Sequence, residues 1–212
     1  MDHDLRNRLR HVRWLGGGSG AGKSTIAVRL ATEVGLRVYG TDEAIRLHVA
    51  RSTPTRHPLL HAFMAMDMDE RWLDRPPELM LETFHGFQGE AFELIVEDLL
   101  ALPAEPPILV EGFRLLPRLV APLLSSPNQA VWLVPTPEFR RAAFETRGST
   151  WAIAGKTSDP ERTRANLLRR DQLFTDQLAV EARALALPII DVDIGVSVEE
   201  LVGRVRRALG LR

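Results

Sequence analysis

Eight residues near the N-terminus have the types and spacing needed to bind a chain of phosphates. They match the pattern G-x-x-x-x-G-K-[ST] and are Gly17, Gly18, Ser19, Gly20, Ala21, Gly22, Lys23 and Ser24. Because glycine tolerates positive φ angles, such a segment can curl until its N–H groups point inward and form an anion site at the start of a helix. The pattern predicts that residues 17–25, Thr25 included, contact a nucleotide. Lys23 is then expected to reach the β- and γ-phosphates, and the Ser24 hydroxyl to bind Mg²⁺.

The residues around this pattern support the same interpretation. Val12 and Trp14 alternate with polar residues, which predicts a short strand before the glycines. After them, apolar residues from Ile26 to Val34 follow one helical stripe, and Gly35 is a natural helix end. The alternative is a glycine-rich turn with a Lys-Ser pair by chance. Lysine occurs only at positions 23 and 156, so 25 of the 27 basic residues are arginine, and a chance lysine here is hard to accept.

Composition narrows the class of protein. The chain has 212 residues, of which 45% are hydrophobic and 26% charged, as in ordinary globular domains. With a net charge of −1 and interspersed signs, it lacks the basic stripe of a nucleic-acid binder. There is no cysteine, and no apolar stretch approaches a membrane span or the apolar region of a secretory signal. We therefore expect a cytoplasmic protein with neither a nucleic-acid nor a membrane partner.

The order of elements predicts an α/β fold in one domain, residues 1–212. Strands are expected at 12–14, 36–40, 108–110, 130–134 and 188–192. Alternation of strands and helices predicts a five-stranded parallel sheet with helices on both faces. Residues 43–105 lack strand patterning and predict a helical insertion, with helices at about 59–73 and 77–102. Residues 148–158 predict a mobile loop, within a lid spanning about 147–171.

Two acidic residues follow predicted strands, at the sheet edge where α/β proteins bind ligands. Asp42 comes after the second strand, and it is either a ligand contact or the N-cap of the next helix. Glu111 ends the third strand, where a carboxylate can organise magnesium. The histidines of the insertion have no zinc-type spacing and are expected in the core or on the surface; they are His57, His61 and His85.

With these residues in view, the chain resembles the P-loop kinases of the nucleoside and nucleotide kinase group over nearly its whole length. Residues 41–46 are similar to the acceptor-site segment of that group. The glycine pattern followed by Gly40-Thr41-Asp42 also resembles chloramphenicol phosphotransferase and the shikimate and gluconate kinases, whose aspartate is the catalytic base or an acceptor ligand. Residues 110–114 resemble the Asp-Gly-Phe-Pro-Arg stretch of adenylate kinases, with glutamate in place of aspartate and without the proline.

This resemblance implies ATP and Mg²⁺ as cofactors and a small molecule as phosphate acceptor. It implies Ser24 and Glu111 as metal ligands. The implied catalytic residues are Lys23, Asp42, Arg147 and Arg170, with Arg169 as an alternative to Arg170. The implied acceptor contacts are Asp42, Arg46, Glu111 and Arg114, although Arg46 is equally well a surface charge.

Three functions remain open on the sequence alone. The first is transfer of the γ-phosphate to a hydroxyl of a nucleoside, metabolite or antibiotic. The second is a nucleoside-monophosphate kinase. The third is an ATP-binding or ATP-hydrolysing switch without an acceptor. No Asn-Lys-x-Asp guanine-reading motif occurs, which disfavours a GTPase, and Gly112 after Glu111 disfavours a motor ATPase. We expect a monomer or a homodimer.

Overall fold

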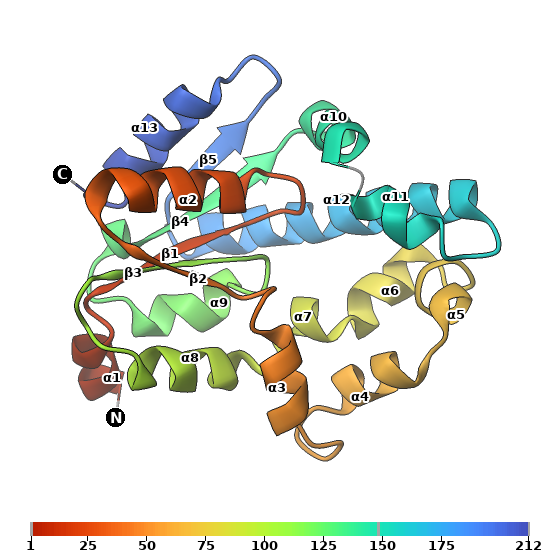
Figure 1. Ribbon diagram of the computed structural model, residues 1–212, viewed down its shortest axis with the longest axis horizontal. Coiled ribbons are helices and arrows are strands. Elements are labelled where there is room, and N and C mark those ends of the chain that lie inside the picture. Colours follow the sequence, from red (N-terminus) through yellow and green to blue (C-terminus); the bar gives the residue numbers. More distant parts are fainter. Residues whose placement is uncertain (1, 148, 212) are drawn as a thin grey trace.

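The centre of the molecule is a five-stranded, all-parallel sheet (Figure 1). The computed structural model describes the backbone of residues 2–147 and 149–211, and the side chains of residues 4–145 and 152–211. The strands are β1 (Val12–Gly17), β2 (Arg37–Gly40), β3 (Ile108–Glu111), β4 (Ala130–Pro135) and β5 (Ile189–Val192). Their order is β2-β3-β1-β4-β5, so the first strand lies in the middle. The α/β class and the five strands are as predicted.

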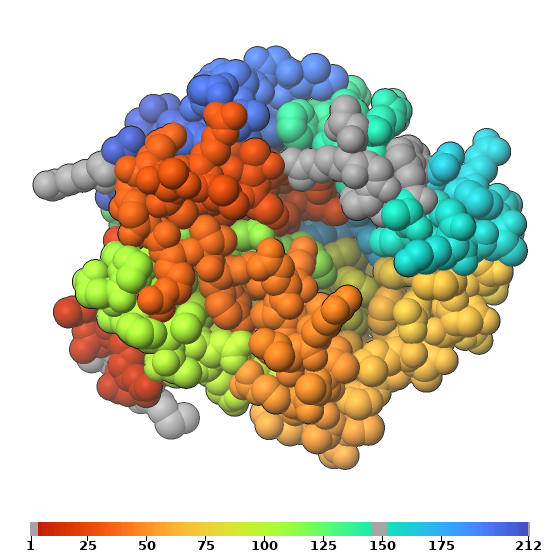
Figure 2. Space-filling model, viewed as in Figure 1, coloured from red at the N-terminus to blue at the C-terminus, as the bar shows by residue number. Residues whose placement is uncertain are grey.

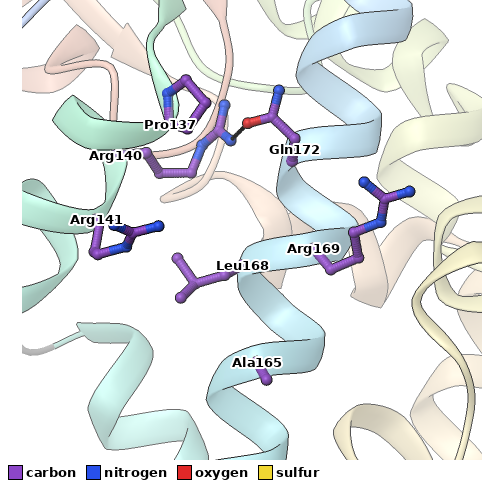
Figure 3. Close-up of a pocket in the computed structure, with 7 residues that line it drawn as sticks. All are labelled: Pro137, Arg140, Arg141, Ala165, Leu168, Arg169 and Gln172. Carbon is purple, nitrogen blue, oxygen red and sulfur yellow. Dashed lines mark hydrogen bonds between the residues drawn. The ribbon is translucent and has the colours of Figure 1, made fainter.

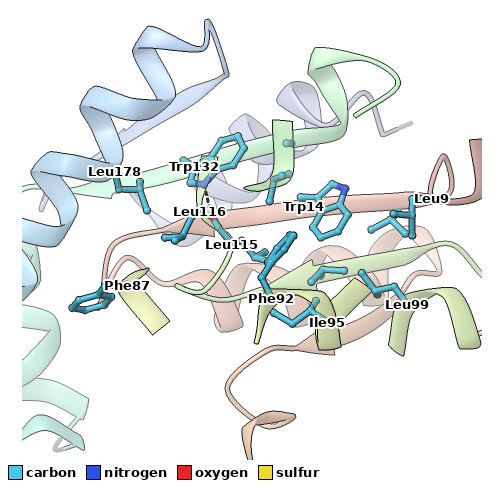
Figure 4. Packing of buried hydrophobic residues seen from close by; sticks show 14 of the residues in the cluster. Leu9, Trp14, Phe87, Phe92, Ile95, Leu99, Leu115, Leu116, Trp132 and Leu178 are labelled. Carbon is cyan, nitrogen blue, oxygen red and sulfur yellow. Dashed lines mark hydrogen bonds between the residues drawn. The ribbon is translucent and has the colours of Figure 1, made fainter. Parts of the chain in front are cut away.

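Helices cover both faces of the sheet, each over its own hydrophobic cluster. On one face lie α2 (Lys23–Val34) and α13 (Val198–Ala208), which pack over Leu15 and Leu133. The other face is covered by α1 (Asp2–Arg8), α8 (Phe92–Ala101), α9 (Pro117–Val120) and α12 (Pro160–Ala184). There Trp14 and Trp132 are fully buried under residues of α8 and α12 (Figure 4). Burial on both faces is what a central parallel strand requires.

The polar residue inside β1 has a local explanation. Arg13 is half-buried, and its Nε donates a hydrogen bond to the carbonyl oxygen of Leu209 at 3.3 Å. Arg13 can therefore interrupt the apolar strand because the carbonyl oxygen of Leu209, at the end of α13, accepts its hydrogen bond.

The insertion is more broken than the sequence predicts. Instead of two long helices it contains α3 (Ile45–Arg51), α4 (Pro58–Ala65), α5 (Met68–Trp72), α6 (Pro77–Thr83) and α7 (His85–Gln88) before α8. Asp67 and Glu70 form a reciprocal capping box that starts α5 as a new helix. Gly89 and Ala91 have φ angles of 86° and 61°, which break the chain between α7 and α8.

The prediction of a loop over residues 148–158 is wrong for residues 149–154 and holds for residues 155–158, which form turns and bends; residue 148 lies outside the described residues. Residues Ser149–Ala154 form helix α11, which follows α10 (Pro137–Arg147). The segment contains no proline, and Ala154 is fully buried, so packing against α12 stabilises a short helix that composition alone did not indicate. The remaining elements are the 3₁₀ turns η1 (Ala121–Leu123) and η2 (Pro127–Gln129).

The insertion and the start of α12 are in contact. Asn166 of α12 donates to the carbonyl oxygen of Leu73 at 3.0 Å, and Asp69 of α5 accepts from the backbone N–H of Ser158 at 2.8 Å. In the space-filling view the orange and yellow insertion meets the cyan α11–α12 region, with a hollow between them and α2 (Figure 2). Within the described part of the chain, no helix has both the length and the apolar character to cross a membrane.

Candidate functional site

The chain turns sharply between β1 and α2, and glycine is needed at several points of this glycine turn (residues 17–22). Gly20 and Gly22 have φ angles of 76° and 85°, in the left-handed region that disfavours side chains. A Cβ atom on Gly17 would lie 2.3 Å from the carbonyl oxygen of Leu133 in β4. The turn therefore lies tightly against the sheet, and α2 starts directly after it. The positive end of the α2 dipole is consequently located at the turn.

The side chain of Lys23 folds back over the glycine turn. Its Nζ donates to the carbonyl oxygens of Gly18 at 2.8 Å and Gly17 at 3.2 Å, and the residue is only 8% exposed. A buried ammonium group next to a helix N-terminus concentrates positive charge at one place. An anion that enters the turn would therefore interact with the Lys23 ammonium group and with the N-terminus of α2.

Ser24 and Glu111 meet at the carboxyl edge of the sheet. Ser24 Oγ donates to Glu111 Oε1 at 3.0 Å, and Glu111 is 8% exposed. Burial raises the pKa of the Glu111 carboxyl, whereas the charge of Lys23 and the Ser24 hydroxyl lower it. A hydroxyl and a carboxylate side by side are suitable oxygen ligands for a hard cation such as Mg²⁺.

No group of three or more histidine, cysteine or acidic side chains suited to a metal exists among the described residues.

Asp42 follows β2, and it does not cap the next helix. α3 begins at Ile45 with Ala44 in the cap position and without a side-chain cap. The Asp42 carboxylate instead accepts a hydrogen bond from Thr41 Oγ1 at 3.4 Å. The side chain of Thr41 packs directly against the backbone of Gly112. A Cβ atom added to Gly112 would lie only 1.8 Å from Thr41 Oγ1. The ends of β2 and β3 therefore meet closely beside Asp42.

The charges around Asp42 act in both directions. Burial raises the pKa of the Asp42 carboxyl, while Lys23 and Arg114 lower it and Glu43 raises it. Protein surrounds the carboxyl, yet part of the Asp42 side chain is still exposed to solvent, so water screens part of these effects. The negative charge of Asp42 in turn raises the pKa of Glu111. The two acids that the sequence singled out thus share one electrostatic environment next to Lys23.

Arg114 lies in the wall of this region. It is 2% exposed, and its Nη1 is 3.3 Å from the carbonyl oxygen of Thr41 and 2.9 Å from His48 Nδ1. Its Nη2 donates to the carbonyl oxygen of Ala91 at 3.0 Å. The other predicted acceptor contact, Arg46, is exposed on α3.

A residue without a role in the sequence-based hypothesis, Arg140, contacts the glycine turn. Its Nε donates to the carbonyl oxygen of Ser19 at 3.4 Å, and Nη1 and Nη2 donate to Gln172 and Thr175 of α12, each at 2.6 Å. It is 2% exposed, and burial lowers the pKa of its guanidinium. The sequence contained part of the signal, because Arg140 lies one helical turn after Thr136, the N-cap that follows β4. The pairing of β4 with β1, which brings Arg140 to the glycine turn, is seen only in the structure.

Arg140 also borders a pocket of about 340 Å³ between α10 and α12 (Figure 3). Three arginines line it, and Figure 3 shows Leu168 between Arg141 on one side and Arg169 on the other. The described residues that line it are Pro137, Arg140, Arg141, Ala165, Leu168, Arg169 and Gln172. Its chemistry suits an anionic group next to the glycine turn.

The structure bears differently on the two predicted lid arginines, Arg147 and Arg170. The side chain of Arg147 lies outside the described residues. Arg170 is buried, and its Nη2 donates to Asp171 at 2.6 Å. Its guanidinium carbon lies 5.0–5.3 Å from the centroids of three rings of the insertion, those of Trp72, Phe84 and Phe87. Arg170 thus joins α12 to the insertion, and Arg169 is the one that lines the pocket.

Comparisons with known proteins identify no family. No protein-family model matches the chain, and no curated protein matches it. A crystal structure of an uncharacterized protein from Eubacterium ventriosum is similar over 95% of this chain and 98% of its own, with 12% sequence identity and a TM-score of 0.49. At that identity and score the similarity supports no functional conclusion.

Proposed function

We propose that this protein is an ATP-dependent phosphotransferase of the P-loop kinase type, which transfers the γ-phosphate to a hydroxyl group of a small molecule. A single observation carries the proposal. Lys23 Nζ lies over the glycine turn, within hydrogen-bond distance of two of its carbonyl oxygens, while the next residue, Ser24, is hydrogen-bonded to Glu111 at the sheet edge. A phosphate-binding cation and a pair of magnesium-type oxygens are therefore adjacent.

In this proposal each residue has a defined task. Lys23 and the backbone of the glycine turn bind the β- and γ-phosphates, and Ser24 and Glu111 hold Mg²⁺. Bound there, Mg²⁺ would supply positive charge that neutralises the phosphates. Arg140 keeps the turn in place, and Arg141 and Arg169 supply positive charge at the adjoining pocket.

Asp42 orients the acceptor hydroxyl and takes its proton. The bond between the γ-phosphorus and the oxygen that bridges it to the β-phosphate breaks, and a new bond forms between that phosphorus and the acceptor oxygen. The products are ADP and a phosphate monoester.

The contacts of Arg114 favour an acceptor that offers a free hydroxyl over an acceptor that already carries a phosphate. In a nucleoside-monophosphate kinase, the adenylate-kinase-like stretch would offer this guanidinium to the acceptor phosphate. Here both Nη atoms already have protein partners: the carbonyl oxygens of Thr41 and Ala91, and His48. The proposal therefore takes an uncharged alcohol as acceptor. The protein would act in the cytoplasm, as a monomer or homodimer, without a nucleic-acid or membrane partner.

An ADP-release screen tests the proposal. The wild-type protein is supplied with ATP and Mg²⁺ and with nucleosides, nucleotides, sugars, and aminoglycoside- or phenicol-type antibiotics. ADP release that rises with one alcohol, together with its phosphorylated product by mass spectrometry, is the expected result. Lys23→Ala should abolish it, whereas Arg183→Ala, which removes an exposed cation near the far end of α12, should not.

Two outcomes contradict the proposal. A steady ATPase rate that is indifferent to every acceptor identifies an ATP-hydrolysing switch instead. Full turnover by Lys23→Ala removes the phosphate-binding role of the glycine turn.

A further inference from the structure

A chain of polar side chains, buried at His48 and Arg114 and partly exposed at Asp98, links α8 to the residues after β3. Asp98 of α8 contacts His48 of α3, with Oδ2 and Nε2 2.8 Å apart, and His48 Nδ1 lies 2.9 Å from Arg114 Nη1. His48 is fully buried and Arg114 is 2% exposed, so water does not substitute for these contacts. None of the roles described above uses His48 or Asp98.

The chemistry of arginine fixes the direction of every hydrogen bond in this chain. A guanidinium can only donate, so His48 Nδ1 must accept. The imidazole proton is therefore on Nε2, which donates to Asp98. Tyr39 also donates to the same carboxylate oxygen at 2.6 Å, and Arg51 is paired with the other oxygen. Asp98 thereby holds His48 in the one neutral tautomer that can accept from Arg114.

The position of Arg114 matters because the segment it holds carries Asp42. Nη1 donates to the carbonyl oxygen of Thr41, the residue before Asp42, and Nη2 donates to the carbonyl oxygen of Ala91 at the start of α8. Four charged groups influence the Asp42 carboxylate: Lys23 and Arg114 favour its ionised form, and Glu43 and Glu111 oppose it. Of the two cations, Lys23 is the one expected to engage phosphate.

We propose that His48, held by Asp98, is a positioning residue: it fixes the Arg114 guanidinium against the Thr41–Asp42 segment and thereby keeps Asp42 ionised and oriented toward the acceptor hydroxyl. The part concerning the hydroxyl rests on the proposed phosphotransferase function. The electrostatic part does not, because it concerns only groups of this chain.

The primary test measures the Asp42 carboxyl directly. Protein labelled with ¹³C-aspartate is titrated by NMR, and Asp42→Asn assigns the signal. In His48→Leu, which removes both hydrogen bonds, we expect the Asp42 pKa to rise by about 0.5–1 unit, less than for a close buried pair because Asp42 is exposed. In His48→Asn the amide oxygen can still accept from Arg114, and the pKa should stay within about 0.3 units of wild type.

A second variant guards against misfolding of His48→Leu. Asp98→Ala removes the carboxylate oxygen that accepts from His48 Nε2, so no side chain of α8 holds His48 in the tautomer that accepts from Arg114. The Asp42 pKa should again rise. If a folded His48→Leu or Asp98→Ala protein leaves the Asp42 pKa unchanged, the proposal is overturned.

The activity readout separates positioning from general damage. His48→Leu should lower kcat for transfer about 10- to 100-fold while the KM for ATP changes less than about twofold, because the glycine turn is untouched. The acid limb of its pH–rate profile should move upward with the Asp42 pKa, and His48→Asn should restore both. If no acceptor is ever found, the NMR shift still tests the positioning role, so failure of the proposed function is distinguishable from failure of this one.

Discussion

Ser24 Oγ donates a hydrogen bond to Glu111 Oε1 at 3.0 Å, although the two residues are 87 positions apart in the chain. The contact exists because β1 and β3 are neighbours in the sheet and Leu15 is in register with Glu111. One strand supplies the turn that starts α2, and the next supplies the acid. The sheet therefore brings together a hydroxyl and a carboxylate that lie far apart in the sequence.

Glu111→Gln should weaken the response to magnesium. An amide keeps the shape but loses the charge, so the Mg²⁺ concentration for half-maximal turnover should increase about 10- to 100-fold. Metal-free nucleotide binding should change little, since Lys23 and the glycine turn are intact. Magnesium titrations of turnover and of nucleotide affinity check this, with Glu97→Gln on the exposed side of α8 as the control. An unaltered magnesium response would remove Glu111 from the metal site.

Asp42→Asn should reduce transfer without reducing stability. Loss of a general base typically lowers the rate about 10²–10⁴-fold. Because burial raises the pKa of Asp42, its charge is held at some disadvantage in the folded protein, and removing it should not lower the melting temperature. Wild-type transfer should fall as the pH drops through this raised pKa. Glu43→Gln, the neighbouring exposed acid, is the matched control, and equal activity of both variants would speak against a role for Asp42.

Gly112→Ala should destabilise the fold. Gly112 has a φ angle of 149°, and a Cβ atom there would lie 1.8 Å from Thr41 Oγ1, so both backbone strain and a collision result. We expect a loss of about 1–3 kcal/mol in the free energy of unfolding. At Gly195 a Cβ atom would meet nothing within 4 Å, so Gly195→Ala should lie close to wild type. Urea denaturation of the two variants gives the comparison, and equal midpoints would contradict it.

Stability should decline as the pH falls from about 6.5 toward 5, partly because of His85. Burial and, to a smaller extent, the charge of Arg114 together lower the pKa of His85 to about 4. In this window the unfolded chain binds a proton at His85 and the folded protein does not, which favours unfolding by up to about 1.4 kcal/mol per pH unit. Buried His48, whose pKa is also lowered, acts in the same direction.

His85→Leu should therefore flatten the pH dependence of the unfolding free energy without abolishing it. Denaturant unfolding at pH 6.5, 6.0, 5.5 and 5.0 measures the slope for both proteins. A slope identical to that of the wild type would show that His85 does not titrate as expected.

The sequence predicted the sheet well because its signals are local. Five apolar strands separated by helical stretches specify an α/β class, and in the structure the side chains of Thr136, Asp159 and Ser197 cap the helices that follow them. The glycine turn was also predictable, since its spacing directly reflects backbone conformation. Contacts between segments that are distant in the sequence were not predictable. Nothing local to His48 indicates that it lies between Asp98 and Arg114.

The insertion shows the limits of periodicity. An apolar stripe across residues 77–102 is continuous in the sequence, yet the chain breaks at Gly89 and at Ala91, whose positive φ no propensity predicts. Arg170 was expected at the phosphates because arginines in lids usually serve there. Its place among aromatic rings depends on how α12 docks on the insertion, which is a tertiary property.

The single helix α12 touches both halves of the site. Thr175 packs so closely on the glycine turn that a Cβ on Gly18 would lie 2.4 Å from its Oγ1, and Arg170, five residues earlier, is buried among rings of the insertion. Displacing the insertion must therefore disturb the helix that supports the turn. For the proposed phosphotransferase, thermodynamic linkage then requires reciprocity: whatever factor a bound acceptor applies to the affinity for nucleotide, the nucleotide applies equally to the affinity for acceptor.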